Sequence, residues 1–216
     1  MSASSNYPCQ RSGKRRAGFA ARRHPIVPDR KEAVLTAIED ALADSDLLLT
    51  TGGVSMGGEH DVVKAALQQL GTITFRKVAM QPGMPQGFGT IALPAAVTPE
   101  AASGDRVPIF TLPGNPVSAY VSFQVFARPA IAALQGYDGL SLEKVQAELT
   151  GPLRSPAGRR SFLRGVLDRA AGKVTPLTGQ GSHQIATLGK ANALVVVPEW
   201  VVQMSEGDTA EVLVLP

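Results

Sequence analysis

Cysteine, aromatic residues and long apolar runs are all scarce in this chain of 216 residues. The single cysteine, Cys9, excludes an internal disulfide and indicates a reducing compartment, so we expect a cytoplasmic protein. No apolar run approaches the roughly 20 residues of a membrane-spanning helix, so we expect no membrane segment. Aromatic residues make up only 5%, whereas 22 glycines and 16 prolines indicate many tight turns. This balance favours a mixed α/β protein over a helical bundle.

Acidic residues are absent from residues 1–24, which carry six Lys and Arg. The rest of the chain has 15 basic and 18 acidic residues, so the net charge of +3 comes from this N-terminal stretch. Because the body of the chain is not basic, we expect no dedicated nucleic-acid binding. The stretch lacks the apolar core of a signal peptide, and we predict an irregular basic N-terminus over residues 1–25. Binding to a nucleic acid or a membrane surface, or a targeting role, is the alternative for it.

A glycine-rich loop lies between an apolar strand and an amphipathic helix. The loop is Thr50-Thr51-Gly52-Gly53-Val54-Ser55-Met56-Gly57-Gly58-Glu59-His60-Asp61, and a helical stripe follows over 62–70. Small residues let the backbone approach a ligand, and the N-terminus of the helix favours an anion. Glu59 and Asp61 would repel that anion unless a divalent cation lies between them, and oxygen ligands suit Mg²⁺. On spacing alone, a carboxylate that only caps the helix is equally consistent.

A second strand–loop–helix unit follows at residues 107–134. Its loop is Pro113-Gly114-Asn115-Pro116, in which Asn115 suits the N-cap and Pro116 the first helical position. The loop contains no acid or base, so we expect it to bind and position a ligand or to be a rigid structural turn. Lys77 ends an alternating run near the same edge, where it can meet a phosphate or be an ordinary surface lysine.

Residues 26–140 alternate strands with helices. This order predicts a largely parallel α/β sheet in a three-layer arrangement, with helices on both faces and ligands beyond the carboxyl ends of the strands. Asp29 and Glu32 predict a capping-box start for a helix that continues to Leu42, and Pro129 predicts a kink in the helix after Pro116.

The last 75 residues contain short β-like runs separated by turn signals, at 145–149, 161–167, 194–197 and 210–215. We therefore predict an α/β domain at 26–140 and a small β domain at 141–216. In the second domain, Arg159, Arg160 and Arg164 either pair with phosphate or are alternating charges on a strand face. The three histidines and Cys9 show no metal-ligand spacing and no nucleophile–base pair.

Several blocks together resemble the molybdopterin molybdenumtransferases, the family that includes the gephyrin E domain. The blocks are Thr50–Gly57, Lys77 with Gln81-Pro82-Gly83-Met84-Pro85 and Phe88-Gly89, Leu112–Ala119, Gly158–Gly165, Gln180-Gly181-Ser182-His183 and Ala191–Leu194. The resemblance runs in order from about Ile26 to the C-terminus. The combination of the two loop motifs is highly specific.

The resemblance implies an enzyme that inserts molybdenum from molybdate into adenylylated molybdopterin, releases AMP and uses Mg²⁺. It implies a molybdopterin-binding α/β domain, a C-terminal β barrel and a homodimer, with a molybdoenzyme or an adenylyltransferase as further partners. It makes Asp61, Asp29 and Lys77 catalytic and assigns the metal to Asp61 and Glu59. The substrate-binding residues that it implies are Gly52, Gly53, Ser55, Pro113, Gly114, Asn115, Pro116, Ser118 and Ser182.

The chain departs from the family pattern in three places. Gln81 and Met84 replace lysines of the family's proline-glycine turn, and Gly58 lengthens the acidic loop by one residue. The family's two further N-terminal domains and the first strand of its central domain have no counterpart, so we expect an N-terminally truncated member with an uncovered sheet edge.

Two other functions compete with the transferase. An inactive remnant would bind molybdopterin or a protein partner without turnover. A molybdopterin adenylyltransferase would share the central fold, but the proline-rich second loop and the C-terminal β domain disfavour it.

Overall fold

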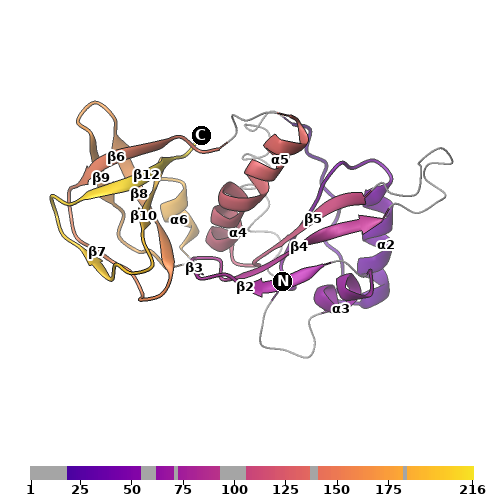
Figure 1. Cartoon of the computed structure of the whole chain (residues 1–216). Coiled ribbons are helices and arrows are strands. Elements are labelled where there is room, and N and C mark those ends of the chain that lie inside the picture. Colours follow the sequence, from indigo (N-terminus) through magenta and orange to yellow (C-terminus); the bar gives the residue numbers. More distant parts are fainter. Residues whose placement is uncertain (1–18, 55–61, 71–72, 93–105, 137–140, 182–183) are drawn as a thin grey trace.

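The computed structural model describes residues 19–54, 62–70, 73–92, 106–136, 141–181 and 184–216. The described chain forms an α/β part with a sheet between helices and a β barrel beside it (Figure 1).

The sheet of the α/β part has four strands in the order β1-β5-β4-β2. They are β1 (Leu48–Thr51), β5 (Arg106–Leu112), β4 (Pro85–Ala92) and β2 (Thr74–Lys77). β1 and β5 are parallel, but β4 runs antiparallel to both β5 and β2. The prediction of a largely parallel sheet is therefore wrong for the described strands. The reason is the short connection at 78–84, because a parallel crossover needs a dozen or more residues.

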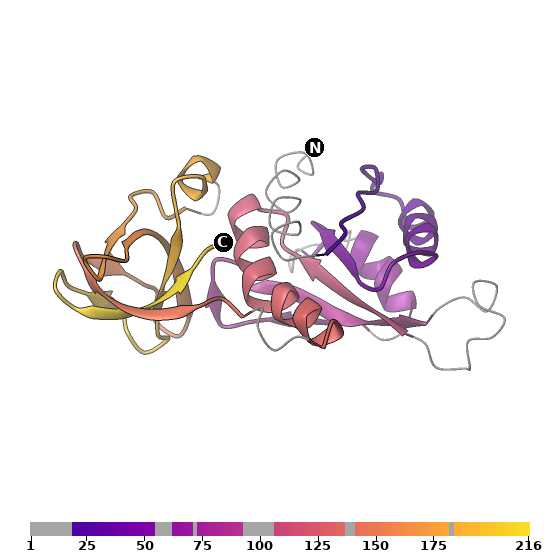
Figure 2. The ribbon, with the colours of Figure 1, turned by 90° about the horizontal axis from the view of Figure 1, so that it is seen from above.

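Helices cover both faces of this sheet, as the sequence predicts (Figure 2). α2 (Lys31–Leu42) and α3 (Val62–Gln69) lie on one face, where their apolar stripes pack with residues of β1, β4 and β5. α4 (Pro116–Ser122), the π-helical turn η1 (Phe123–Ala127) and α5 (Arg128–Leu134) lie on the other face. This arrangement confirms the predicted three-layer α/β fold.

Two details of the helices differ from expectation. α2 begins at Lys31 with Arg30 at the N-cap position and no side-chain cap, so the capping box built on Asp29 is wrong. The Arg30 amide instead donates to the Pro28 carbonyl at 2.7 Å, and this turn delays the start of the helix. The irregularity expected at Pro129 falls one turn earlier, at η1, because proline has no amide to donate to the preceding turn.

The helical run Pro116–Leu134 is the only one in the described part of the chain with the length and apolar character of a membrane span. It is mostly buried inside the protein, where it packs against the sheet on one side and the barrel on the other.

Five strands of the last part form a closed barrel. They are β6 (Lys144–Leu149), β8 (Arg160–Asp168), β9 (Lys173–Pro176), β10 (Ala193–Val197) and β12 (Thr209–Val214). Their order is β10-β12-β6-β9-β8, and a β8–β10 pairing closes the circle. The predicted C-terminal β barrel is confirmed. The short strands β7 (Leu153–Arg154) and β11 (Gln203–Met204) pair outside it, and the short helix α6 (Ile185–Leu188) precedes β10.

A shared core joins the barrel to the α/β part. β3 (Met80–Gln81) is part of the connection between β2 and β4, and it pairs in parallel with the start of β8. Met80 and Val121 pack in one hydrophobic cluster with Phe162, Leu194 and other barrel residues. The barrel is thus held directly against α4, the helix that follows the second loop.

Candidate functional site

The two glycine-bearing loops meet at the carboxyl ends of β1 and β5. The Gly52 amide donates to the Leu112 carbonyl at 3.0 Å, which extends the β1–β5 pairing past the strand ends. Gly52 and Gly53 have φ values of 88° and 70°, which favour glycine. A Cβ on Gly114 would stand 3.2 Å from the Gly52 Cα, so this close approach requires that Gly114 has no side chain. The two loops therefore touch, and the surface formed by Gly52, Gly53 and residues 113–116 is called the mouth below.

The second loop ends in a capped helix, as its sequence predicts. The Asn115 side chain accepts a hydrogen bond from the Val117 amide at 3.2 Å, and Pro116 occupies the first turn. The helix that starts here continues to Leu134, so its N-terminus adds a partial positive charge to the mouth. Ser118, expected to bind substrate, is buried within the first turns of this helix.

Lys77 lies at the same edge of the sheet as the two loops. Because β4 is antiparallel to both of its neighbours, β2 runs in the same direction as β5, and Lys77 is its last residue. Its side chain is exposed. One strand separates β2 from β5, so Lys77 is about 10 Å from the second loop at the usual strand spacing. It can reach only a ligand that extends across the mouth.

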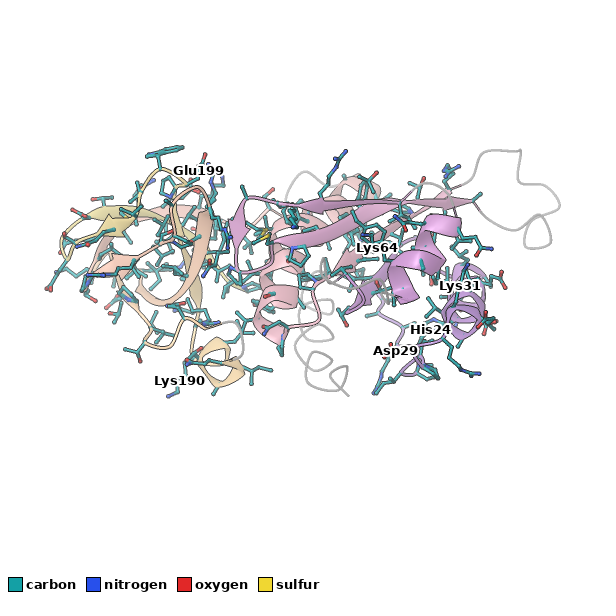
Figure 3. The ribbon with its side chains drawn as sticks, turned by 90° about the horizontal axis from the view of Figure 1, so that it is seen from below. His24, Asp29, Lys31, Lys64, Lys190 and Glu199 are labelled. Atoms are coloured by element: carbon teal, nitrogen blue, oxygen red, sulfur yellow. The ribbon has the colours of Figure 1, made fainter. Side chains whose placement is uncertain are left out.

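Four predicted site residues, Ser55, Glu59, Asp61 and Ser182, lie outside the described residues. Asp29 is described and exposed, in the bend just before α2 (Figure 3). Within the described ranges, no group of three or more histidine, cysteine or acidic residues forms a metal cluster. The proposed ligands of Mg²⁺ therefore remain the sequence prediction of Glu59 and Asp61.

Two buried hydroxyls that sequence reasoning missed lie at the foot of the first loop. Thr50 and Thr111 are register partners on the parallel strands β1 and β5. Their Oγ1 atoms are buried and have no hydrogen-bond partner in the described part of the chain. Mg²⁺ takes oxygen ligands, mainly carboxylates, phosphates and water, so the carboxylates of this loop fit the cation and the two hydroxyls add oxygen atoms at the foot of the loop. The doubled threonine before the glycines was the available signal.

The proline-glycine turn is tied to α4 by a buried side chain. The Gln86 amide donates to the Gly83 carbonyl at 2.6 Å and to the Ser122 hydroxyl at 2.5 Å. The Gln81–Pro82 peptide is cis, and Gly83 has a φ of 102°. This network fixes the turn that carries Gln81 and Met84.

Arg164 of the barrel is more buried than a strand-face charge would be. Only 1% of it is exposed, and its Nη2 donates to the carbonyls of Gly179 and Gly181 at 2.7 and 3.2 Å. Burial lowers the pKa of its guanidinium from the ordinary value, but arginine stays protonated. Its Nε has no hydrogen-bond partner among the described residues. Arg160, in contrast, is exposed and forms an ion pair with Glu199 at 3.2 Å.

The loop held by Arg164 lies between β9 and α6, and α6 contacts α4 (Figure 1). This loop leads into Ser182, the residue of the barrel that the sequence assigned to the site. The barrel loop and the second loop of the mouth therefore flank two helices that touch each other.

A shallow pocket of about 310 Å³ lies elsewhere, among Arg128, Glu143, Arg169 and the C-terminal residues. Arg128 is twelve residues beyond Pro116, about 18 Å along the helix, so this pocket is not part of the mouth. Burial lowers the pKa of the Arg128 guanidinium.

Family models match both parts of the chain. Residues 4–133 match the model described as the probable molybdopterin binding domain, and residues 146–215 match the MoeA C-terminal region (domain IV). The fold and the paired loops thus define a molybdopterin-binding α/β domain followed by the barrel that ends MoeA proteins.

The chain belongs to the molybdopterin molybdenumtransferase family of molybdenum cofactor biosynthesis proteins. It is 42% identical to molybdopterin molybdenumtransferase 2 of Mycobacterium tuberculosis over 183 residues, and this matched stretch covers 82% of this chain and 42% of that protein. It is 32% identical over 203 residues to gephyrin of Dictyostelium discoideum, over 88% of this chain and 28% of that protein. The chain spans less than half the length of these relatives.

Solved structures of molybdenum cofactor biosynthesis proteins have a similar fold. A molybdenum cofactor biosynthesis protein from Pyrococcus furiosus superposes with a TM-score of 0.71 at 26% identity, over 96% of this chain and 64% of that one. A molybdopterin biosynthesis moeA protein from Pyrococcus horikosii gives a TM-score of 0.66 at 28% identity, over 87% of this chain and 42% of that one.

Proposed function

We propose that this chain inserts molybdenum from molybdate into adenylylated molybdopterin and releases AMP. The observation that carries the proposal is the mouth formed where Gly52 and Gly114 meet, at the carboxyl ends of two parallel strands. Ligands of open α/β sheets bind at such edges. The relatives named molybdopterin molybdenumtransferase support the choice of reaction.

The two loops hold the substrate in this proposal. The Gly53 amide and the N-terminus of the helix after Asn115 face the phosphates, because both favour negative charge. The Gly52 amide is used in the bond to Leu112, so Gly52 contributes by letting the backbone come close to the ligand. Pro113 and Pro116 keep the second loop in one conformation, which limits the entropy that substrate binding costs. Lys77 meets the part of the ligand that extends toward β2.

The first loop also supplies carboxylates. Glu59 and Asp61 would hold Mg²⁺, with Asp29 as a further acidic group near the start of α2. When bound, the cation would spread the charge that develops as the phosphoanhydride is cleaved.

The barrel contributes the binding of the oxyanion. Arg164 keeps a positive charge buried beneath the loop that leads to Ser182, and no carboxylate neutralises it within the described residues. A fixed cation with an unpartnered N–H suits an anion such as molybdate. We place molybdate at this loop.

The same proposal includes a homodimer in the cytoplasm, with a molybdoenzyme or an adenylyltransferase as further partners. The adenylyltransferase function for this chain itself is disfavoured, because the MoeA C-terminal region follows the α/β domain. The remaining alternative is a protein that binds adenylylated molybdopterin without turnover.

One substitution tests the metal assignment within this proposal. The purified chain receives adenylylated molybdopterin, Mg²⁺ and molybdate, and AMP release is followed. We expect Asp61→Asn to abolish molybdate-dependent release while the thermal unfolding midpoint stays close to that of the wild type. Full turnover in Asp61→Asn would contradict the assignment, and substrate binding without release in the wild type would support the inactive alternative.

A further inference from the structure

The side-chain amide of Gln180 binds the barrel loop at 177–181 to β8. The Arg164 amide donates to the Gln180 Oε1 at 2.9 Å, and the Gln180 Nε2 donates to the Arg164 carbonyl at 2.8 Å. The same Nε2 also donates to the Leu177 carbonyl at 2.7 Å. Gln180 therefore pairs with the backbone of β8 as a neighbouring strand would, and it also closes the turn that begins at Leu177.

The backbone that Gln180 holds also carries the two carbonyls that fix the Arg164 guanidinium. Gly179 and Gly181, the residues on either side of Gln180, accept from Arg164 Nη2. Arg164 is thus joined to this loop by four hydrogen bonds, and the Leu177 amide adds a fifth by donating to the Arg164 carbonyl at 3.0 Å. Release of Gln180 would free the carbonyls that accept from the guanidinium.

A second amide side chain in the barrel makes the same kind of bond. The Leu167 amide donates to Asn192 Oδ1 at 2.7 Å, and Asn192 Nδ2 donates to the Leu167 carbonyl at 3.0 Å. Leu167 is on the same strand as Arg164, three residues further on. Asn192 lies just before β10, beyond α6, and holds no residue of the proposed site. Asn192 is therefore a matched control for Gln180, because its side chain makes the same kind of hydrogen bonds but holds only structural groups.

We propose that Gln180 is a positioning residue for molybdate: its side-chain amide holds the loop at 177–181, and through this loop it holds the Arg164 guanidinium. The proposal rests on the proposed function. Gln180 itself need not touch the ligand, because it acts through the groups that it holds. Since small displacements of positioned groups cost large factors in rate, loss of this amide should weaken the use of molybdate more than it weakens the fold.

The experiment compares Gln180→Ala and Gln180→Glu with Asn192→Ala in the full chain. Steady-state AMP release is measured against molybdate and against adenylylated molybdopterin, and amide exchange of Arg164 is followed by NMR. For Gln180→Ala we expect the KM for molybdate to rise roughly tenfold or more, with little change in the KM for adenylylated molybdopterin. Exchange of the Arg164 amide should accelerate. Asn192→Ala should lose stability with its kinetic constants unchanged.

Gln180→Glu adds a pH signature. Its ionised carboxylate accepts from the Arg164 amide but cannot donate to the Arg164 and Leu177 carbonyls, whereas the protonated form regains one donor. Relative to the wild type, its activity should recover as the pH falls. If Gln180→Ala does not fold, the pH dependence of Gln180→Glu tests the proposal in its place.

Three results decide the matter. A molybdate KM that rises equally in Gln180→Ala and Asn192→Ala would reduce Gln180 to a structural role, and so would an Arg164 amide that stays protected in Gln180→Ala. A wild-type chain without molybdate-dependent AMP release would refute the proposed function itself. In that case the exchange of the Arg164 amide still shows whether Gln180 holds the loop.

Discussion

The contact between Gly52 and Gly114 allows a direct test of the mouth by Gly114→Ala. The new Cβ would lie 3.2 Å from the Gly52 Cα, closer than an ordinary contact of 3.4 Å or more, and backbone cannot rotate away as a side chain can. The two loops must then separate by a few tenths of an ångström. Such overpacking costs about 1–3 kcal/mol, partly offset by about 0.4–1 kcal/mol from the stiffer unfolded chain. We expect a net loss of about 1 kcal/mol in the free energy of unfolding.

The matched control is Gly151→Ala in the barrel. Neither glycine has a positive φ, but a Cβ on Gly151 would meet nothing within 4 Å. This variant should be as stable as the wild type or slightly more stable, because only the unfolded-state term applies. Urea unfolding measures both variants in the same way.

Activity should follow the geometry of the mouth. A displacement of 1 Å in a positioning group can cost about 100-fold, so a few tenths of an ångström predict a loss of about 3- to 10-fold in kcat/KM for Gly114→Ala. Gly151→Ala should retain wild-type kcat/KM for molybdate-dependent AMP release. If Gly114→Ala gained stability and kept full activity, the close approach of the loops would be wrong.

Three further expectations follow from the described contacts. Gly87→Ala should lower the free energy of unfolding by roughly 1–3 kcal/mol, because its Cβ would overlap the Thr111 hydroxyl. Adding Thr111→Ala should recover part of this loss. A double-mutant cycle that shows no coupling between the two positions would contradict this expectation. Asn115→Ala should lose about 1 kcal/mol of stability with the helix cap, whereas Asn115→Asp should keep most of it in thermal unfolding. The hydrogen bond from Arg169 lowers the pKa of Glu143. The pair therefore stabilises the fold at pH values above the unfolded-state pKa of Glu143, and this stabilisation is lost as the pH falls through the lowered pKa of the folded state. Arg169→Gln should raise the pKa of Glu143 in an NMR titration, and an unchanged pKa would exclude the pair in solution.

Features that depend on a few residues close together in the sequence could be predicted. The second loop is the clearest case, because Asn115 caps and Pro116 begins a helix by local chemistry alone. The three layers followed from the alternation of apolar runs, and the small β domain from the turn signals after residue 140. The closure of that domain into a barrel was implied by the family resemblance. The location of Lys77 at the same edge of the sheet as the two loops was also predicted, because the sequence ends the strand of Lys77 near that edge.

Features that depend on distant pairing could not be predicted. The short connection at 78–84 does indicate that β4 is antiparallel to β2, but no local signal shows that β4 also pairs with β5. The burial of Arg164 is decided by carbonyls of Gly179 and Gly181, and nothing in an alternating strand pattern distinguishes it from the exposed Arg160. Gln180 stands in a block that resembles the family, but nothing in the sequence indicates that its side chain binds β8, because a glutamine in a loop has no periodicity.

The capping box at Asp29 shows how a local signal can also fail. The spacing to Glu32 was right, but the turn from Pro28 to Arg30 moved the helix start past the aspartate. Asp29 is left exposed beside α2, where it stays available as the acidic group that the family resemblance assigns to the site.

The central claim is that the mouth and the barrel loop together carry out molybdenum insertion. The most direct measurement is AMP release by the purified chain with adenylylated molybdopterin and Mg²⁺, with and without molybdate. The account predicts release that depends on molybdate and saturates with it. Tight binding of adenylylated molybdopterin without any molybdate-dependent release would contradict the account and establish a binding protein instead.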